Sequence, residues 1–213
     1  MRIEERYAHI LDWFRQHMPS AESELRYDNP YQLLVAVILS AQCTDKRVNM
    51  TTPALFDRFP TPQHMAEADP EEIYPYIKSI SYPNNKAKNL SGMARMLVSE
   101  FGGQVPSDID RLQRLPGVGR KTANLILGDV YHVPGSTVVD THCIRISNRL
   151  GLVDDLKDPV KIEAELRRCL PPEKSSDFCH RIVLHGRAVC TARRPDCAGC
   201  TLRSVCQFAE QQG

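Results

Sequence analysis

Residues 112–127 read LQRLPGVGRKTANLIL and are the most informative segment of the sequence. Apolar residues at helical spacing flank the PGVG segment at 116–119, so the sequence predicts a short helix, a tight turn and a second helix that begins near Arg120. Gly117 and Gly119 allow a tight turn and expose consecutive backbone N–H groups at the start of a helix. The helix dipole favours an anion there, so a phosphate is the natural ligand. An ordinary corner between two helices explains the same spacing, and both interpretations stay open.

Helical periodicity continues along the rest of the chain. Asn29-Pro30 with Gln32 predicts a capping box, and the apolar run at 33–39 then predicts a central helix that is buried on all sides. Further helix starts are predicted at Thr61-Pro62, Asp69-Pro70, Ser107 and Asp158-Pro159. No stretch alternates in the way a strand does, and no hairpin signal occurs. The sequence therefore predicts an all-α fold of about ten helices joined by short loops.

Composition narrows the class of protein further. The 213 residues are 42% apolar and 25% charged, which is typical of a globular protein and argues against wholesale disorder. The apolar run at 33–39 is far shorter than the roughly 20 residues of a membrane span. The charged N-terminus does not resemble a secretory signal, so we expect a cytoplasmic protein. Residues 111–213 carry 16 Lys and Arg against 11 Asp and Glu, a basic bias that suits a polyanion without identifying nucleic acid.

Two charged residues are candidates for catalysis. Lys121 lies in the first turn of the helix after the PGVG segment, where the dipole disfavours a cation and so favours the neutral, nucleophilic amine. It is equally explained as an exposed lysine that contacts phosphate. Asp140 precedes a helix in the segment STVVDTHCIRISNRLGL, residues 136–152. Its carboxylate either caps that helix or faces a reaction centre, where it takes a proton or stabilises a cationic sugar, and spacing does not decide between these roles.

Half of the eight cysteines cluster near the C-terminus, at Cys190, Cys197, Cys200 and Cys206. Four thiols within 17 residues in a reducing compartment indicate a closed metal site rather than disulfides. Zinc and a [4Fe–4S] cluster both accept four cysteines, and the single Cys-x2-Cys pair only slightly favours iron–sulfur. Arginines crowd this region: Arg181, Arg187, Arg193, Arg194 and Arg203. They either hold phosphates or offset the negative charge of the thiolates, and these two roles are compatible.

In combination, four segments resemble the endonuclease III family of helix-hairpin-helix DNA glycosylases, and the similarity covers almost the whole chain. The segments are LLVAVILSAQCTDKRVN (33–49), LPGVGRKTANLIL (115–127), VVDTHCIRISNRLGL (138–152) and HGRAVC (185–190) with three further cysteines. The resemblance implies two all-α domains with DNA bound across the cleft between them. One is a six-helix barrel of residues 23–133, with the helix-hairpin-helix at about 109–128. The other joins residues 1–22 to 134–213 and carries an iron–sulfur loop at 190–206.

The resemblance also implies base excision repair by a bifunctional DNA glycosylase and abasic-site (AP) lyase. An oxidised pyrimidine is flipped out of the duplex, Lys121 attacks C1′ and displaces it, and a Schiff base forms. β-Elimination then cuts the strand 3′ to the site, while Asp140 assists proton transfer. Gly117 and Gly119 supply N–H groups to a phosphate, and Gln42 enters the gap that the flipped nucleotide leaves.

The cofactor and partners follow from the same resemblance. Cys190, Cys197, Cys200 and Cys206 would hold a [4Fe–4S] cluster that shapes a basic loop, in which Arg193 and Arg194 contact DNA. The expected partner is double-stranded DNA with a damaged base or an abasic site. We expect a monomer without a membrane partner, associated with the nucleoid.

One departure from the family pattern concerns residues 81–83. Gly-Leu-Tyr is usual there, whereas this chain has Ser-Tyr-Pro, so Tyr82 takes the position of a wedging leucine and can stack on bases. The departure bears on lesion preference and not on the reaction class. Three alternatives remain: a monofunctional mismatch glycosylase, which usually lacks the lysine at 121; a non-catalytic DNA-binding module; and a zinc protein with an unrelated partner.

Overall fold

All regular secondary structure in the computed structural model, which describes residues 1–21 and 23–211, is helical, and the all-α prediction is confirmed. The α-helices in chain order are α1 (Ile3–His17), α2 (Pro30–Ser40), α3 (Asp45–Arg58), α4 (Pro62–Glu67), α5 (Pro70–Ile77), α6 (Pro83–Phe101), α7 (Ile109–Arg114), α8 (Arg120–Asp129), α9 (Thr141–Leu150), α10 (Pro159–Cys169), α11 (Ser175–Ala188) and α12 (Gln207–Glu210). Short 3-10 helices lie at Pro172–Lys174 and Arg203–Val205. None of the helices in the described ranges combines the length and the apolar character that a membrane span requires.

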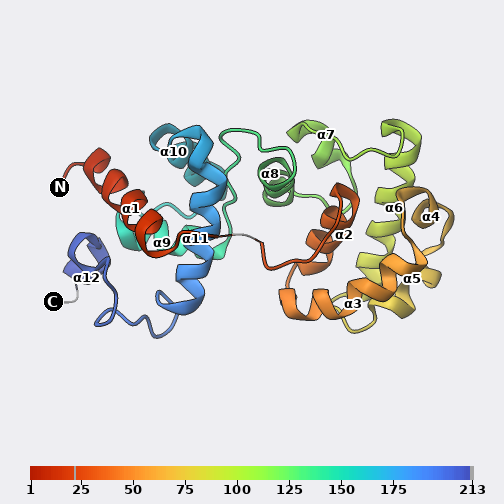
Figure 1. The fold of residues 1–213 in the computed structure, drawn as a ribbon, viewed down its shortest axis with the longest axis horizontal. Coiled ribbons are helices and arrows are strands. Elements are labelled where there is room, and N and C mark those ends of the chain that lie inside the picture. Colours follow the sequence, from red (N-terminus) through yellow and green to blue (C-terminus); the bar gives the residue numbers. More distant parts are fainter. Residues whose placement is uncertain (22, 212–213) are drawn as a thin grey trace. The chain divides into compact units, whose positions relative to one another are not determined.

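The chain divides into two compact units (Figure 1). The first, called here the hairpin unit, is Ser23–Tyr131 and contains α2 to α8. The second, called the cysteine unit, combines the described residues of Met1–Glu22 with those of His132–Gly213 and contains α1 and α9 to α12.

Helix α2 forms the centre of the hairpin unit. Every residue from Leu33 to Leu39 is at most 3% exposed, and the helix contacts α3, α6 and α8, as predicted for a helix buried on all sides (Figure 1). The Asn29 side chain accepts a hydrogen bond from the Gln32 N–H at 3.0 Å. The Gln32 side chain, however, accepts from the N–H of Asp28 at 2.8 Å and not from that of Asn29, so the predicted capping box is displaced by one residue.

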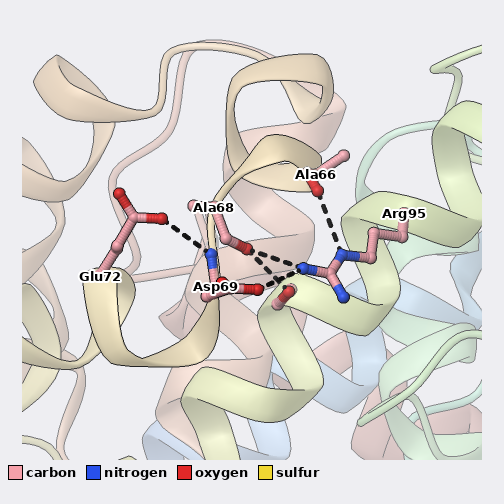
Figure 2. A network of polar contacts seen from close by, with 6 residues as sticks. Ala66, Ala68, Asp69, Glu72 and Arg95 are labelled. Carbon is pink, nitrogen blue, oxygen red and sulfur yellow. Dashed lines mark hydrogen bonds and ion pairs between the residues drawn. The ribbon is translucent and has the colours of Figure 1, made fainter.

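The long helix α6 is the frame on which α4 and α5 rest (Figure 1). Figure 2 shows how Arg95 of α6 holds the link between those two helices: its guanidinium donates to the carbonyls of Ala66 at 3.1 Å and Ala68 at 3.3 Å. It also pairs with Asp69 at 2.9 Å, and the backbone N–H of Asp69 donates to the Glu72 carboxylate in a capping box. These contacts fix the entry into α5 on one side of α6.

In the cysteine unit, α1 packs against α11, where the rings of Phe14 and Phe178 meet edge to face at 5.8 Å. The same helix is tied to the end of α9, because Arg6 donates to the Leu150 carbonyl at 2.8 Å and Tyr7 to that of Leu152 at 3.0 Å. Helix α9 also contacts α11 and α12. The N-terminal helix is therefore an integral part of a unit whose other residues lie beyond position 131.

Candidate functional site

The two glycines of the turn between α7 and α8 differ in backbone conformation and in the space around them. Gly117 has φ +81°, and a Cβ placed there would lie 3.1–3.3 Å from the side chain of Asn89 on α6, so the turn requires glycine. Gly119, the N-cap of α8, has an ordinary φ of −91°, and a Cβ there would meet nothing within 4 Å. Because the first N–H groups of a helix have no partner within it, this open N-terminus suits an anion.

We expect Gly117→Ala to lower the free energy of unfolding by about 1–2 kcal/mol, since alanine is strained at positive φ and its methyl group would press on Asn89. Gly119→Ala is the matched control and should cost less than about 1 kcal/mol, because its backbone is relaxed and the space is open. Denaturant unfolding of both variants measures the difference. Equal losses in the two variants would contradict the steric account of Gly117.

Lys121 is the second residue of α8, and its side chain is exposed. The helix buries its opposite face, which includes Ala123, Ile126 and Leu127, in the core of the hairpin unit. This amphipathic pattern fixes the rotation of α8 about its axis. Lys121 is thereby held on the solvent side of the helix, directly after the open N-terminus at Gly119.

Two further exposed residues of the hairpin unit, Gln42 and Tyr82, have left-handed backbones, with φ of +54° and +56°. Left-handed residues other than glycine are uncommon and concentrate at functional sites. Gln42 lies in the turn after α2, in which the Cys43 N–H donates to the Ser40 carbonyl at 3.0 Å. Tyr82 is the N-cap of α6, and 65% of it is exposed.

Lys86, which sequence reasoning missed, lies between these two turns in the structure. Lys86 is only 5% exposed, and its Nζ donates to the carbonyls of Leu39 at 2.8 Å and Ala41 at 2.6 Å. Burial lowers the pKa of Lys86 from its ordinary value, while the nearby Cys43 acts in the opposite direction. A lysine four residues into a helix reads as solvent-exposed in sequence, and only the packing of α6 against α2 reveals its contacts.

Asp140 caps α9 in the cysteine unit. Its Oδ1 accepts a hydrogen bond from the backbone N–H of Cys143 at 2.8 Å. The carboxylate is half-buried, and the two residues before it, Val138 and Val139, are buried. The capping role is therefore present, and it also places a negative charge at a helix N-terminus, where the dipole stabilises it.

The cysteine loop after α11 surrounds a single pocket. Cys190, Cys197, Cys200 and Cys206 all line this pocket. Burial raises the pKa of Cys200 and of Cys206, and the neighbouring cysteines add to the rise. Within the described residues, no three His, Cys, Asp or Glu side chains are arranged to hold a single metal ion.

Arg149 of α9 anchors this loop from the other side. Its guanidinium donates to the Cys190 sulfur at 3.3 Å and to the carbonyls of Thr191 at 2.8 Å and Ala192 at 3.0 Å. It also lies over the ring of Phe208, 4.6 Å from the ring centroid. The backbone of the loop is thus attached to α9 by contacts between protein atoms alone.

Arg193 and Arg194 project from the same loop and are exposed. The Thr191 hydroxyl donates to the Arg194 carbonyl at 2.6 Å, which closes a tight turn around them. Arg181, which the sequence grouped with them, differs: it is buried on α11 and pairs with Asp177 at 3.0 Å. It is therefore part of the interior of the unit and not of the basic loop.

Comparison with known proteins places these features in one family. The sequence model described as "HhH-GPD superfamily base excision DNA repair protein" matches residues 35–172. Endonuclease III of Synechocystis sp. is 45% identical over 206 residues, which cover 97% of this chain and 94% of that protein. Endonuclease III of Escherichia coli K12 is 39% identical over 202 residues, 95% of each chain.

Solved structures agree with the sequence comparisons. The structure of a non-covalent endonuclease III–DNA complex superimposes with a TM-score of 0.93 at 38% identity, over 100% of this chain and 99% of that one. A thermostable thymine-DNA glycosylase, at 22% identity and a TM-score of 0.85, shares the fold. The resemblance deduced from sequence motifs is thereby confirmed. The chain belongs to the endonuclease III family, within the HhH-GPD superfamily of base excision DNA repair proteins.

Proposed function

We propose that this protein removes oxidised pyrimidines from duplex DNA with Lys121 as the nucleophile and then cuts the strand 3′ to the abasic site. As a member of the endonuclease III family, the protein is a base-excision DNA glycosylase with AP lyase activity. The observation that carries the assignment of the nucleophile is the exposed position of Lys121 in the first turn of α8, directly after the open N-terminus at Gly119. A solved relative is described as a trapped endonuclease III–DNA covalent intermediate, which supports covalent chemistry of this kind.

The proposed reaction begins with the neutral amine of Lys121. Its Nζ forms a bond to C1′ of the flipped nucleotide, the glycosidic bond breaks, and the base leaves with the bonding electrons and takes up a proton. Loss of a proton from nitrogen and opening of the sugar ring give a Schiff base. Removal of a C2′ proton then expels the 3′ phosphate oxygen, which breaks the strand, and water finally releases the amine.

Asp140 is proposed to act on the same nucleotide as a carboxylate that stabilises the cationic sugar and accepts the proton from Lys121. Its Oδ1 already accepts the Cys143 N–H at 2.8 Å, which supports this role because the bond fixes the orientation of the carboxyl group. The second carboxylate oxygen remains for the sugar. Capping and catalysis are thus compatible uses of one side chain.

Duplex DNA with a damaged base or an abasic site is the proposed partner of a monomer that works on nucleoid DNA in the cytoplasm. Gly117 and Gly119 would present backbone N–H groups to a phosphate, while Gln42 and Tyr82 would enter the stack where a nucleotide has left it. Arg193 and Arg194 would bind backbone phosphates from the cysteine loop. The left-handed backbones of Gln42 and Tyr82 support a specialised use of both positions.

Arg193→Ala should weaken binding to any duplex. It should also reduce the slope of log Kd against log salt concentration by about one, which is the contribution of one phosphate contact. Arg15→Ala is a matched control, because this exposed arginine lies on α1 of the same unit and pairs with Asp12. Fluorescence anisotropy at several salt concentrations measures both slopes. An unchanged slope for Arg193→Ala would contradict the phosphate contact and leave the arginine to offset thiolate charge.

The proposed cofactor is a [4Fe–4S] cluster held by Cys190, Cys197, Cys200 and Cys206. The donor set fits, because four soft thiol ligands surround one pocket in which thiolates need a cationic partner. When bound, the cluster would order the basic loop.

Visible absorption and iron analysis of the purified protein test the cofactor. A brown protein with about four iron atoms per chain is the expected result. A colourless protein that contains one zinc would contradict it.

The substrate is tested with a 5′-labelled duplex that carries one oxidised thymine. We expect base release and a strand cut that leaves an unsaturated aldehyde on the 3′ end. Release of the base with an intact strand would instead indicate a monofunctional glycosylase. Binding without either reaction would indicate a non-catalytic DNA-binding protein.

A further inference from the structure

We propose that Lys86 is a positioning residue, which locks the turn carrying Gln42 in one of two orientations and ties that turn to Tyr82. The inference rests on the proposed use of Gln42 and Tyr82 inside the duplex. It extends that proposal to a residue that itself lies beneath the surface.

The turn of residues 40–43 is of type II. Ala41 has φ −57° and ψ 116°, Gln42 has φ +54°, and the Cys43 N–H donates to the Ser40 carbonyl at 3.0 Å. A type II turn ordinarily has glycine or asparagine at the position that Gln42 occupies. Rotation of the peptide between Ala41 and Gln42 would convert the turn to type I and return Gln42 to negative φ. Gln42 therefore needs an external contact that holds this peptide in place.

Lys86 supplies that contact. Its Nζ donates at 2.6 Å to the carbonyl of Ala41, which is the oxygen of the peptide that would rotate. A second bond, 2.8 Å to the Leu39 carbonyl, anchors the ammonium at the C-terminal end of α2, where the helix dipole stabilises a cation. Rotation of the Ala41–Gln42 peptide would turn its carbonyl away and leave a buried ammonium with one partner fewer, which is costly.

The same residue is bonded to the other turn through its backbone. The Lys86 N–H donates to the Tyr82 carbonyl at 3.1 Å, which is the first hydrogen bond of α6. One residue thus links the peptide before Gln42 to the left-handed residue that begins α6. Further along α6, the Asn89 side chain lies beneath Gly117, so the hairpin turn rests on the same helix.

The expected consequence is discrimination between damaged and intact DNA. Gln42 and Tyr82 can enter only where a nucleotide has left the stack, so their orientation affects binding to a gap and not to an intact duplex. Side chains that are already oriented lose less conformational freedom on binding. Lys86 should therefore raise the affinity for a gapped site relative to intact duplex, without contact to DNA.

The test measures dissociation constants for two duplexes, one intact and one with a single tetrahydrofuran abasic analogue. The quantity compared is the ratio of the dissociation constant for the intact duplex to that for the abasic duplex. The variants are Gln42→Ala, Lys86→Met and the double variant. Lys88→Met is the matched control, because Lys88 is exposed on the same helix and its loss removes the same charge. Lys86→Gln, which keeps a donor without the charge, replaces Lys86→Met if the latter melts below the assay temperature.

We expect Lys86→Met and Gln42→Ala each to reduce the ratio about fivefold to tenfold, with no further loss in the double variant, because the lysine acts through the glutamine. Lys88→Met should leave the ratio unchanged. An unchanged ratio for Lys86→Met, with or without equal weakening on both duplexes, would overturn the proposal. Additive losses in the double variant would also overturn it. The catalytic proposal is tested by a different experiment. It would fail if no covalent adduct were trapped at Lys121, and the ratio of dissociation constants does not affect that result.

Discussion

Lys121→Gln is expected to reduce strand cleavage at an abasic site to the uncatalysed rate and to leave the affinity for the same DNA within about threefold of wild type. Glutamine has no amine that can form a Schiff base, so the lyase step loses its nucleophile. The open N-terminus of α8, formed by the backbone at Gly119, is unaffected by the side chain at 121. Single-turnover cleavage and a binding titration on one duplex measure the two effects.

Lys88→Gln controls for the loss of one positive charge, since Lys88 is an exposed lysine of the same unit. It should keep both cleavage and binding. If Lys121→Gln loses binding in step with cleavage, Lys121 is a phosphate contact and not the nucleophile. Cleavage retained at the wild-type rate would show that another amine performs the reaction.

Asp140→Asn is expected to slow base release and strand cleavage at least about a hundredfold, because it removes the proton acceptor and the negative charge near the sugar. Asparagine caps helices about as well as aspartate, and its amide oxygen can still accept the Cys143 N–H. The melting temperature should therefore fall only slightly, by the loss of the favourable charge–dipole interaction. Single-turnover kinetics with a melting curve measure both effects.

Asp140→Ala separates the cap from the charge. It should lose as much activity as Asp140→Asn and in addition lose about 1 kcal/mol of stability with the cap. If Asp140→Asn retains near-normal activity while Asp140→Ala does not, the cap alone explains the residue. A loss of activity that unfolding fully accounts for would lead to the same conclusion.

Local signals in the sequence predicted much of the fold. Thr61-Pro62, Asp69-Pro70 and Asp158-Pro159 each begin a helix as expected, because a side-chain acceptor followed by proline specifies the first turn within three residues. The central helix α2 was predictable for the same reason, since its cap and its apolar run are contiguous. Such features depend on short-range geometry, which one sequence contains in full.

Choices between neighbouring acceptors were less predictable. Asp108 and not Ser107 caps α7, where its side chain accepts the Arg111 N–H at 2.9 Å. The Gln32 side chain likewise accepts from the backbone N–H of Asp28 and not from that of Asn29. Both alternatives satisfy the same helix terminus at nearly the same cost, so small differences in the path of the chain decide between them.

In the candidate site too, features of short span were predictable from the sequence, and contacts between distant residues were not. The glycine turn, the cap at Asp140 and the grouping of four cysteines are visible as motifs of short span. Lys86 was missed because its partners at Leu39 and Ala41 lie more than 40 residues away. Arg181 was assigned to the basic loop because sequence proximity does not show that α11 turns it inward to Asp177.

Borohydride trapping on a duplex with one abasic site shows whether Lys121 forms a Schiff base with the sugar. The reagent reduces the imine to a stable amine, and peptide mapping of the adduct then identifies the attached residue. We predict one covalent adduct per chain, located on Lys121 and absent from Lys121→Gln. A folded, cofactor-loaded wild-type protein that forms no adduct, or one that forms it at another amine, would contradict the account.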